Sequence, residues 1–151
     1  MNAKNLSCSA MMAFVMALTA GLTMAFAPVA SAQTAAPPKA RLVLQVSDAE
    51  PAKWALALNN AKNVQAEMGA ANVDIEIVAY GPGIGMLKDD ALVGNRVTEV
   101  VQAGVKVVAC ENTMTAQKLT KADMNPAASY APSGVVQIIK RQREGWAYVR
   151  P

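Results

Sequence analysis

Strand-like and helix-like segments alternate along most of the chain, and this alternation constrains the fold more than any other feature. The strand-like runs are short, rich in β-branched residues and bounded by turn residues, whereas the helix-like runs carry apolar residues at helical spacing. Three successive strand–helix pairs and a last strand predict a single α/β domain with a flavodoxin-like, doubly wound, mostly parallel sheet. The predicted strands are 41–46, 73–80, 105–109 and 146–149, and the predicted helices are 51–68, 90–103, 113–119 and 134–144.

Local signals refine this outline. Ser47 and Asp48 can cap the first helix, and Pro51 suits its first turn. The second strand alternates apolar and polar residues, which is typical of a strand near a sheet edge. Residues 125–132 are predicted as a loop. Ser133 is predicted to cap the last helix, with Val135, Ile138 and Ile139 facing inward and the cations Lys140, Arg141 and Arg143 on a solvated helix end.

The first 32 residues have the three parts of a secretory signal peptide. Lys4 is the only charged residue before Lys39, an apolar run covers residues 10–27, and the small residues at 30–32 form a cleavage pattern. We therefore predict a signal peptide over residues 1–32, a linker over 33–40 and one domain over 41–151. The expected location is periplasmic or secreted, with no stable membrane insertion after cleavage. An uncleaved membrane anchor is the alternative, because the apolar run is long enough to span a bilayer.

The remaining composition excludes several classes of protein. After cleavage Cys110 is the only cysteine, so no intrachain disulfide can form, and the chain contains no histidine. Without histidine, a Ser/His or Cys/His hydrolase cannot be built, and the commonest metal ligand is missing. We therefore expect no metal site and no cofactor. Loss of Lys4 lowers the net charge from +3 to +2, which is too weak to imply a nucleic-acid partner.

A glycine-rich segment lies between the second predicted strand and the helix that follows it. Its residues Gly81, Gly83 and Gly85 occupy a place where phosphate-binding loops occur. The sequence GPGIG matches neither the dinucleotide-binding pattern nor the P-loop, and Pro82 removes one amide donor. A turn that requires positive φ is the favoured interpretation.

Cys110 follows the third predicted strand. In a doubly wound sheet, ligands and reactive groups gather beyond the carboxyl ends of the strands. A helix begins about two residues later, and its amides and dipole would stabilise a thiolate. The neighbouring carboxylate of Glu111 would act in the opposite direction. A buried structural cysteine is the alternative interpretation.

Several segments of the chain resemble the DsrE/DsrF-like (YchN-like) family. They are VSDAEPAKWALALNNAKN, VDIEIVAYGPGIGML and GVKVVACENTMTAQKLT, the last followed by APSGVVQIIKRQREGWAYVRP. Together they cover nearly the whole mature domain. The resemblance implies a flavodoxin-like α/β fold that often assembles into trimers or hexamers. It also implies a sulfur-relay protein that carries sulfur as a persulfide, and Cys110 matches the position of the family's carrier cysteine.

Two hypotheses follow for the function. In the first, the protein is a periplasmic DsrE-like protein whose Cys110 carries or transfers sulfane sulfur, with a sulfur donor or acceptor protein as partner. In the second, it is a non-catalytic, oligomeric module that binds a small ligand or a partner in the crevice formed by residues 47–51, 81–85 and 110–113. Apolar surface at residues 127–132 favours a homo-oligomer in both cases. The candidate site residues are Cys110 as the reactive group and Asn112, Thr113, Ser47, Gly81 and Gly83 as binding residues.

Overall fold

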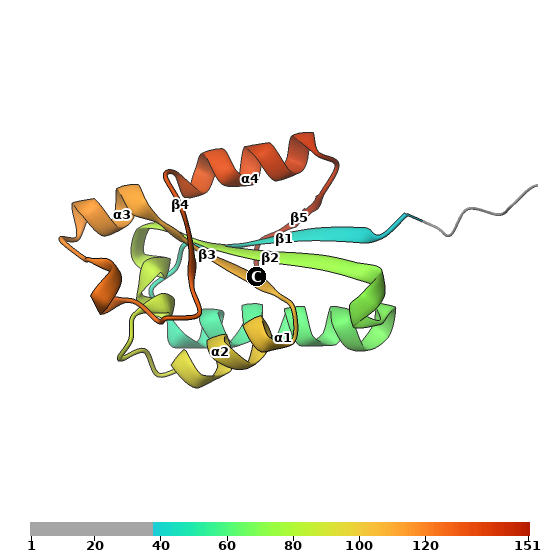
Figure 1. The fold of residues 1–151 in the computed structure, drawn as a ribbon, viewed down its shortest axis with the longest axis horizontal. Helices are drawn as coiled ribbons and strands as arrows, with labels where there is room; N and C mark the ends of the chain where they lie inside the picture. Colours follow the sequence, from blue (N-terminus) through green and yellow to red (C-terminus); the bar gives the residue numbers. More distant parts are fainter. Residues whose placement is uncertain (1–37) are drawn as a thin grey trace, which may run out of the picture. The chain divides into compact units, whose positions relative to one another are not determined.

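Five strands form one sheet in the order β4-β3-β2-β1-β5, and every neighbouring pair is parallel (Figure 1). The computed structural model describes residues 38–151, so the predicted signal peptide and residues 33–37 of the predicted linker lie outside the described residues. β1 begins one residue before the predicted strand. The strands are β1 Ala40–Val46, β2 Val73–Ala79, β3 Lys106–Cys110, β4 Ser129–Ala131 and β5 Ala147–Val149.

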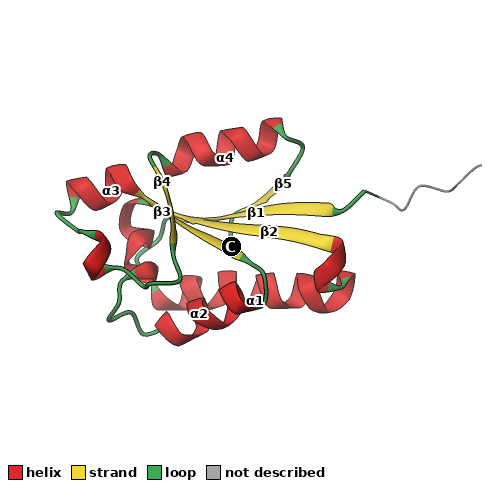
Figure 2. Cartoon of the chain, viewed as in Figure 1, coloured by secondary structure: helices red, strands yellow, loops and turns green. Residues whose placement is uncertain are grey.

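Helices cover both faces of the sheet, which confirms the doubly wound α/β fold (Figure 2). α1 and α2 lie on one face, α4 lies on the other, and α3 leaves the carboxyl end of β3. The helices are α1 Pro51–Met68, α2 Gly94–Gln102, α3 Glu111–Ala116 and α4 Gly134–Arg143, with 3₁₀ helices at Ala70–Asn72, Gly81–Leu87 and Lys121–Asp123. Within residues 38–151, none of these helices combines the length and apolar character that crossing a membrane requires.

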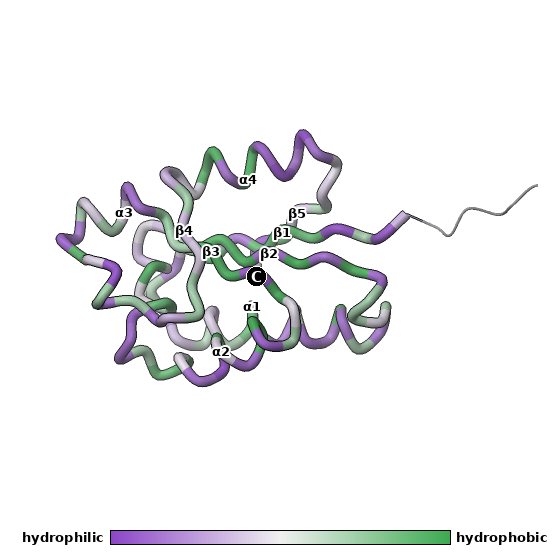
Figure 3. The backbone as a smooth tube through the Cα atoms, in the orientation of Figure 1, coloured by the Kyte–Doolittle hydropathy of each residue, from purple (hydrophilic) through white to green (hydrophobic). Residues whose placement is uncertain are grey.

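The alternation of side chains along the strands divides the core into two layers. The larger layer lies between the sheet and α1 and α2, where Leu44 and Ile77 are fully buried. The smaller layer lies under α4, and it contains Val43, Val78, Val108, Ala131 and Ile138. Figure 3 shows hydrophobic central strands between helices of mixed character. One helix therefore covers the second face almost alone.

The segment predicted as a loop contains β4. This strand is three residues long and pairs with β3, with Ala131 opposite Cys110. Such a short strand has no detectable alternation of its own, because only its pairing with β3 defines it. β4 matters for the site because it brings the start of α4 beside the end of β3.

The predicted edge position of the second strand is wrong. β2 lies in the middle of the sheet, between β1 and β3, and its Glu76 is fully buried. The carboxylate is held by α4: Gln137 Nε2 donates to Glu76 Oε1 at 2.6 Å, and Arg141 Nε and Nη2 donate to Oε2 at 3.0 and 2.6 Å. The polar residue Glu76 of β2 is thus part of an ion pair beneath α4 and does not face solvent. Arg141, which was predicted on a solvated helix end, is the partner in this ion pair.

The orientation of α4 also differs from the prediction. Ser133 caps the helix as expected, accepting a hydrogen bond from the Val136 amide. Only Ile138 of the three residues expected to face inward is buried, whereas Val135 and Ile139 are about half exposed. The position of Arg141 over Glu76 and the Trp146 ring explains this rotation, because it turns the polar stripe of the helix toward the sheet.

Three helix starts need correction as well. α3 covers Glu111–Ala116 with Cys110 as its N-cap, so it begins two residues earlier than the predicted helix 113–119 and ends earlier too. Glu50, not Ser47 or Asp48, is the N-cap of α1, and no side chain caps it, although Pro51 occupies the first turn as predicted. α2 begins at Gly94, four residues later than predicted, because a turn precedes it.

Candidate functional site

Cys110 is the last residue of β3 and lies on the face of the sheet that α4 covers. It follows Lys106 and Val108 in the alternation of the strand, and Val108 belongs to the small core layer under α4. Only 5% of Cys110 is exposed. The residue is the N-cap of α3, and β4 runs beside it. Its sulfur is therefore placed between the first turns of two helices.

The ionisation of Cys110 depends on burial and on the polar groups around the sulfur. Burial raises the pKa of the Cys110 thiol, but the neighbouring hydrogen-bonding groups outweigh burial and hold the pKa below its usual value. These groups are the Thr113 side chain and the backbone of Gly134, Thr113 and Asn112. Polar groups of this kind around a thiolate favour the charged form. The Asn112 amide itself donates to the Pro132 carbonyl oxygen at 3.1 Å, and the Cys110 side chain makes no cap hydrogen bond at the start of α3.

The Thr113 side chain connects α3 to the glycine-rich segment. The Gly81 amide donates to Thr113 Oγ1 at 3.0 Å. Gln117 Nε2 donates to the Gly81 carbonyl oxygen at 3.3 Å, which gives a second contact between the end of α3 and the same glycine. Gly81 has φ +53°, so the expectation of positive φ holds at this position.

Gly83 and Gly85 are required for a different reason, namely close packing. A Cβ atom on Gly83 would lie 2.3 Å from the Val46 carbonyl oxygen, and one on Gly85 would lie 3.1 Å from the Trp54 ring. Neither glycine has positive φ. Gly83 therefore fixes the 3₁₀ helix Gly81–Leu87 against the end of β1, and the structure gives it no contact with the sulfur.

Gly134 lies at the start of α4, and Tyr80 packs against it. A Cβ atom on Gly134 would lie 3.0 Å from the Tyr80 Cβ, so the bare glycine lets the Tyr80 ring pack against the start of α4. Burial is the main cause that raises the pKa of the Tyr80 hydroxyl, and a hydrogen bond with Ser47 acts in the opposite direction. Asn112 and Thr113 thus follow Cys110 in the first turn of α3, Gly81 contacts Thr113, and Ser47 lies beside Tyr80 without a contact to Cys110.

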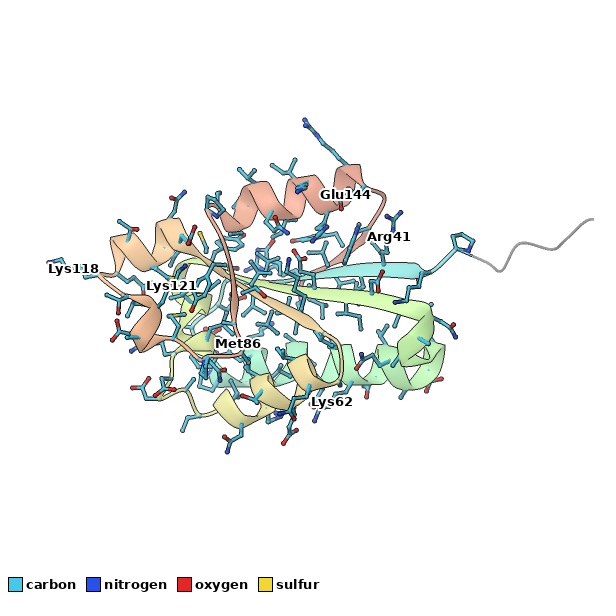
Figure 4. The ribbon with its side chains drawn as sticks, viewed as in Figure 1. Arg41, Lys62, Met86, Lys118, Lys121 and Glu144 are labelled. Atoms are coloured by element: carbon cyan, nitrogen blue, oxygen red, sulfur yellow. The ribbon has the colours of Figure 1, made fainter. Side chains whose placement is uncertain are left out.

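Glu111 is paired with a lysine. Its carboxylate lies 3.9 Å from the ammonium of Lys121. Figure 4 labels Lys121 in the segment that follows α3. The main influences on the pKa of Cys110 are burial and the nearby hydrogen-bonding groups, and Glu111 is not among them. The opposing effect of the Glu111 carboxylate stays a prediction. Among residues 38–151, no group of three or more acidic or cysteine side chains could hold a metal ion.

Sequence reasoning missed Gly134 and Tyr80. The Ser133 cap indicated that the Gly134 amide would be free at the start of a helix. The sequence did not indicate that β4 pairs with β3, which is the pairing that brings the start of α4 close to Cys110.

The fold and site define a doubly wound α/β protein with a free, buried cysteine at the carboxyl end of an inner strand. The model of the DsrE/DsrF-like family matches residues 24–151. The chain therefore belongs to the DsrE/DsrF-like family.

Two solved structures are similar to this chain. MTH1491 of Methanobacterium thermoautotrophicum, described as a protein of unknown function, is similar with 34% identity and a TM-score of 0.72, over 75% of this chain and 100% of that one. BT1422 of Bacteroides thetaiotaomicron, a conserved protein of unknown function, shares the fold with 12% identity and a TM-score of 0.59, over 74% of this chain and 94% of that one. No functionally curated protein matches the chain.

Proposed function

We propose that the protein carries a sulfur atom as a persulfide on Cys110. The observation that carries the proposal is the place of Cys110 at the carboxyl end of β3 and at the N-cap of α3, where neighbouring polar groups hold the pKa of the thiol below its usual value in spite of burial. A lowered pKa increases the fraction of thiolate at neutral pH, and the thiolate is the nucleophile. Membership of the DsrE/DsrF-like family supports a sulfur-relay type of protein at the family level.

Loading and release are both exchanges of one S–S bond for another. In loading, the Cys110 thiolate attacks a terminal sulfur of a sulfane donor such as polysulfide. A new S–S bond forms on Cys110, and the shortened donor leaves with the electron pair of the broken bond. In release, an acceptor thiolate attacks the outer sulfur, and Cys110 leaves as a thiolate. Neither step needs a separate oxidant or reductant, so a donor and an acceptor are the partners that this chemistry requires.

Incubation of the folded protein with polysulfide tests the proposal. Mass spectrometry should show the gain of one sulfur atom, and a thiol reductant should remove it. Cys110→Ser should abolish the adduct and keep the circular dichroism spectrum, because serine is nearly isosteric with cysteine. Alkylation of the folded, unloaded protein should have its midpoint below the value of about 8.5 for a free cysteine.

A contrary result would favour the second hypothesis. If Cys110 gains no sulfur and is alkylated only after denaturation, it is a structural residue, and persulfide transport is excluded. A binding module that uses the crevice around residues 47–51 and 81–85 would survive this result, because it requires nothing of the thiol.

The proposed location is the periplasm or the exterior, after removal of residues 1–32. N-terminal sequencing of protein from the native host should begin at Gln33, because cleavage is expected after Ala32. Recovery of the intact chain from the membrane fraction would instead indicate an uncleaved anchor.

A further inference from the structure

Cys110 is buried, although any reaction of its thiol requires contact with another molecule. Only 5% of the residue is exposed, and it lies on the face of the sheet that α4 covers. Cys110 pairs with Ala131 of β4, and α4 begins three residues later, at Gly134 (Figure 1). Three residues span at most roughly 10 Å, so the first turn of α4 has to lie near Cys110. Access to the thiol therefore depends on the position of α4.

α4 has little apolar contact with the sheet. Ile138 is its one large apolar side chain that is buried, and the other three are 45% to 62% exposed. α1, on the opposite face, buries Trp54, Ala57, Leu58 and Ala61. A segment with few buried apolar contacts separates from a fold at a lower free energy than the rest of the molecule does. α4 therefore combines proximity to Cys110 with a weak apolar attachment.

A polar cluster supplies most of the remaining attachment. Gln137 and Arg141 lie one helical turn apart on α4, and both donate hydrogen bonds to the fully buried carboxylate of Glu76, at 2.6 to 3.0 Å. We call these three residues the latch. Glu76 lies opposite Lys106, the first residue of β3, whereas Cys110 is the last residue of that strand. The latch thus holds α4 at a distance from the thiol, and its residues can be changed without altering the surroundings of the sulfur.

We infer that α4 is a lid over Cys110, that the latch holds this lid closed, and that the thiol reacts when α4 separates locally from the sheet. The inference goes beyond the proposed function, because it concerns access to the thiol by any reagent. Opening breaks the hydrogen bonds to Glu76 and the bond from the Asn112 amide to the Pro132 carbonyl oxygen. In the proposed sulfur carrier, the closed lid would shield the persulfide, and opening would admit the donor or the acceptor.

The rate at which iodoacetamide alkylates Cys110 in the folded, full-length protein tests the lid. The mass of the peptide that contains Cys110 separates this reaction from that of Cys8. Rates are compared above the alkylation midpoint, so that a change in the thiol pKa does not affect them. We expect Glu76→Gln to raise the rate roughly tenfold or more, because a weaker latch increases the open population.

Val97→Ala is the matched control for loss of stability. Val97 is fully buried in α2, in the core layer on the other face of the sheet, so its truncation destabilises the whole fold without touching the latch. Its alkylation rate should stay within about twofold of the wild-type value. If Glu76→Gln fails to fold, Gln137→Ala replaces it. This variant keeps the ion pair and loses one hydrogen bond to Glu76, so a rise of roughly threefold is expected.

The urea dependence of the wild-type rate gives a second measurement. Local opening exposes less surface than unfolding, so the logarithm of the rate should rise with urea less steeply than the equilibrium m-value requires for global unfolding. A slope equal to that m-value overturns the inference, and so does a Val97→Ala variant that accelerates in proportion to its stability loss. An unchanged rate in the latch variant overturns it as well. Failure of polysulfide to load the wild type would remove the proposed function alone, because alkylation requires no persulfide.

Discussion

Gly83 is the residue at which a single added carbon atom would disturb the site most. Its Cβ would lie 2.3 Å from the Val46 carbonyl oxygen and 2.9 Å from the Ser47 Cα. Both are backbone atoms at the end of β1, which cannot move aside as a flexible side chain can. We expect Gly83→Ala to lower the free energy of unfolding by about 3 kcal/mol, measured by urea denaturation.

Gly104→Ala is the control for this substitution. Gly104 has φ +91°, and a Cβ atom added to it would have no neighbouring atom within 4 Å, so only backbone strain should result. The expected cost is about 1 kcal/mol. Equal stability losses for the two variants would contradict the packing role of Gly83.

The residues of the site differ in how far the sequence could predict them. Cys110, Asn112 and Thr113 are adjacent in the chain, so a strand followed by a helix was sufficient to bring them together. The influence of the Thr113 side chain and the Gly134 backbone on Cys110 depends on how the elements pack around the sulfur. No periodicity in the sequence encodes such packing.

At the scale of elements, α4 is attached to the sheet by a buried ion pair. Glu76 of β2 is fully buried, and Arg141 donates hydrogen bonds to its carboxylate. Arg141 Nη1 also donates to Glu144 Oε2 at 2.8 Å. Figure 4 places Glu144 at the carboxyl-terminal end of α4. The hydrogen bond with Arg141 is the largest cause of the lowered pKa of the Glu144 carboxyl, and the charge of Arg41 of β1 makes a smaller contribution in the same direction. The link is central to the fold because the core layer beneath α4 is small.

Loss of one member of this pair should be strongly destabilising. Glu76→Gln keeps the volume of the side chain but removes the buried carboxylate and leaves Glu144, at the end of α4, as the remaining carboxylate partner of Arg141. We expect a loss of about 3 kcal/mol in the free energy of unfolding, because the buried half of the ion pair that attaches α4 to the sheet is lost. A double variant that also carries Arg141→Gln should lose less than the sum of the two single variants.

The exposed pair between Lys62 and Glu99 provides the comparison. Their charged atoms lie 2.9 Å apart on the surface, where solvent screens the interaction. Glu99→Gln should therefore leave the urea midpoint nearly unchanged. If Glu76→Gln were as mild as Glu99→Gln, the proposed attachment of α4 would be incorrect.

The elements with a clear internal pattern were predictable, and those defined by their neighbours were not. β1, α1 and β3 carry runs that identify them within a few residues. β4 was missed because three residues show no period. The position of β2 in the sheet was mispredicted because a polar residue in a buried ion pair and a polar residue facing solvent give the same alternation of apolar and polar residues. Only the position of α4 over Glu76 distinguishes the two cases.

For the whole molecule, three exposed large apolar side chains lie together on α4, and none lies in residues 127–132. In that segment Ala128 and Tyr130 pack against the main core layer, and Ala131 is buried in the smaller one. On α4, Val135, Val136 and Ile139 are 49%, 62% and 45% exposed. A cluster of this kind is typical of a surface that contacts another protein. The predicted homo-oligomer therefore remains a prediction, with α4 as its expected contact surface.

Sedimentation of the wild-type protein and of a double variant, Val136→Lys with Ile139→Lys, tests this prediction. We expect the wild type to sediment as a closed oligomer at micromolar concentration and the variant to sediment as a monomer, because two desolvated ammonium groups would oppose association. The monomer should keep its fold, since both side chains are largely exposed within the single chain. Leu92→Lys is the matched control: Leu92 is 87% exposed but lies before α2, so this substitution should leave the oligomer intact. A monomeric wild type would contradict the oligomer itself, whereas an oligomeric double variant would show that subunits meet through a surface other than α4.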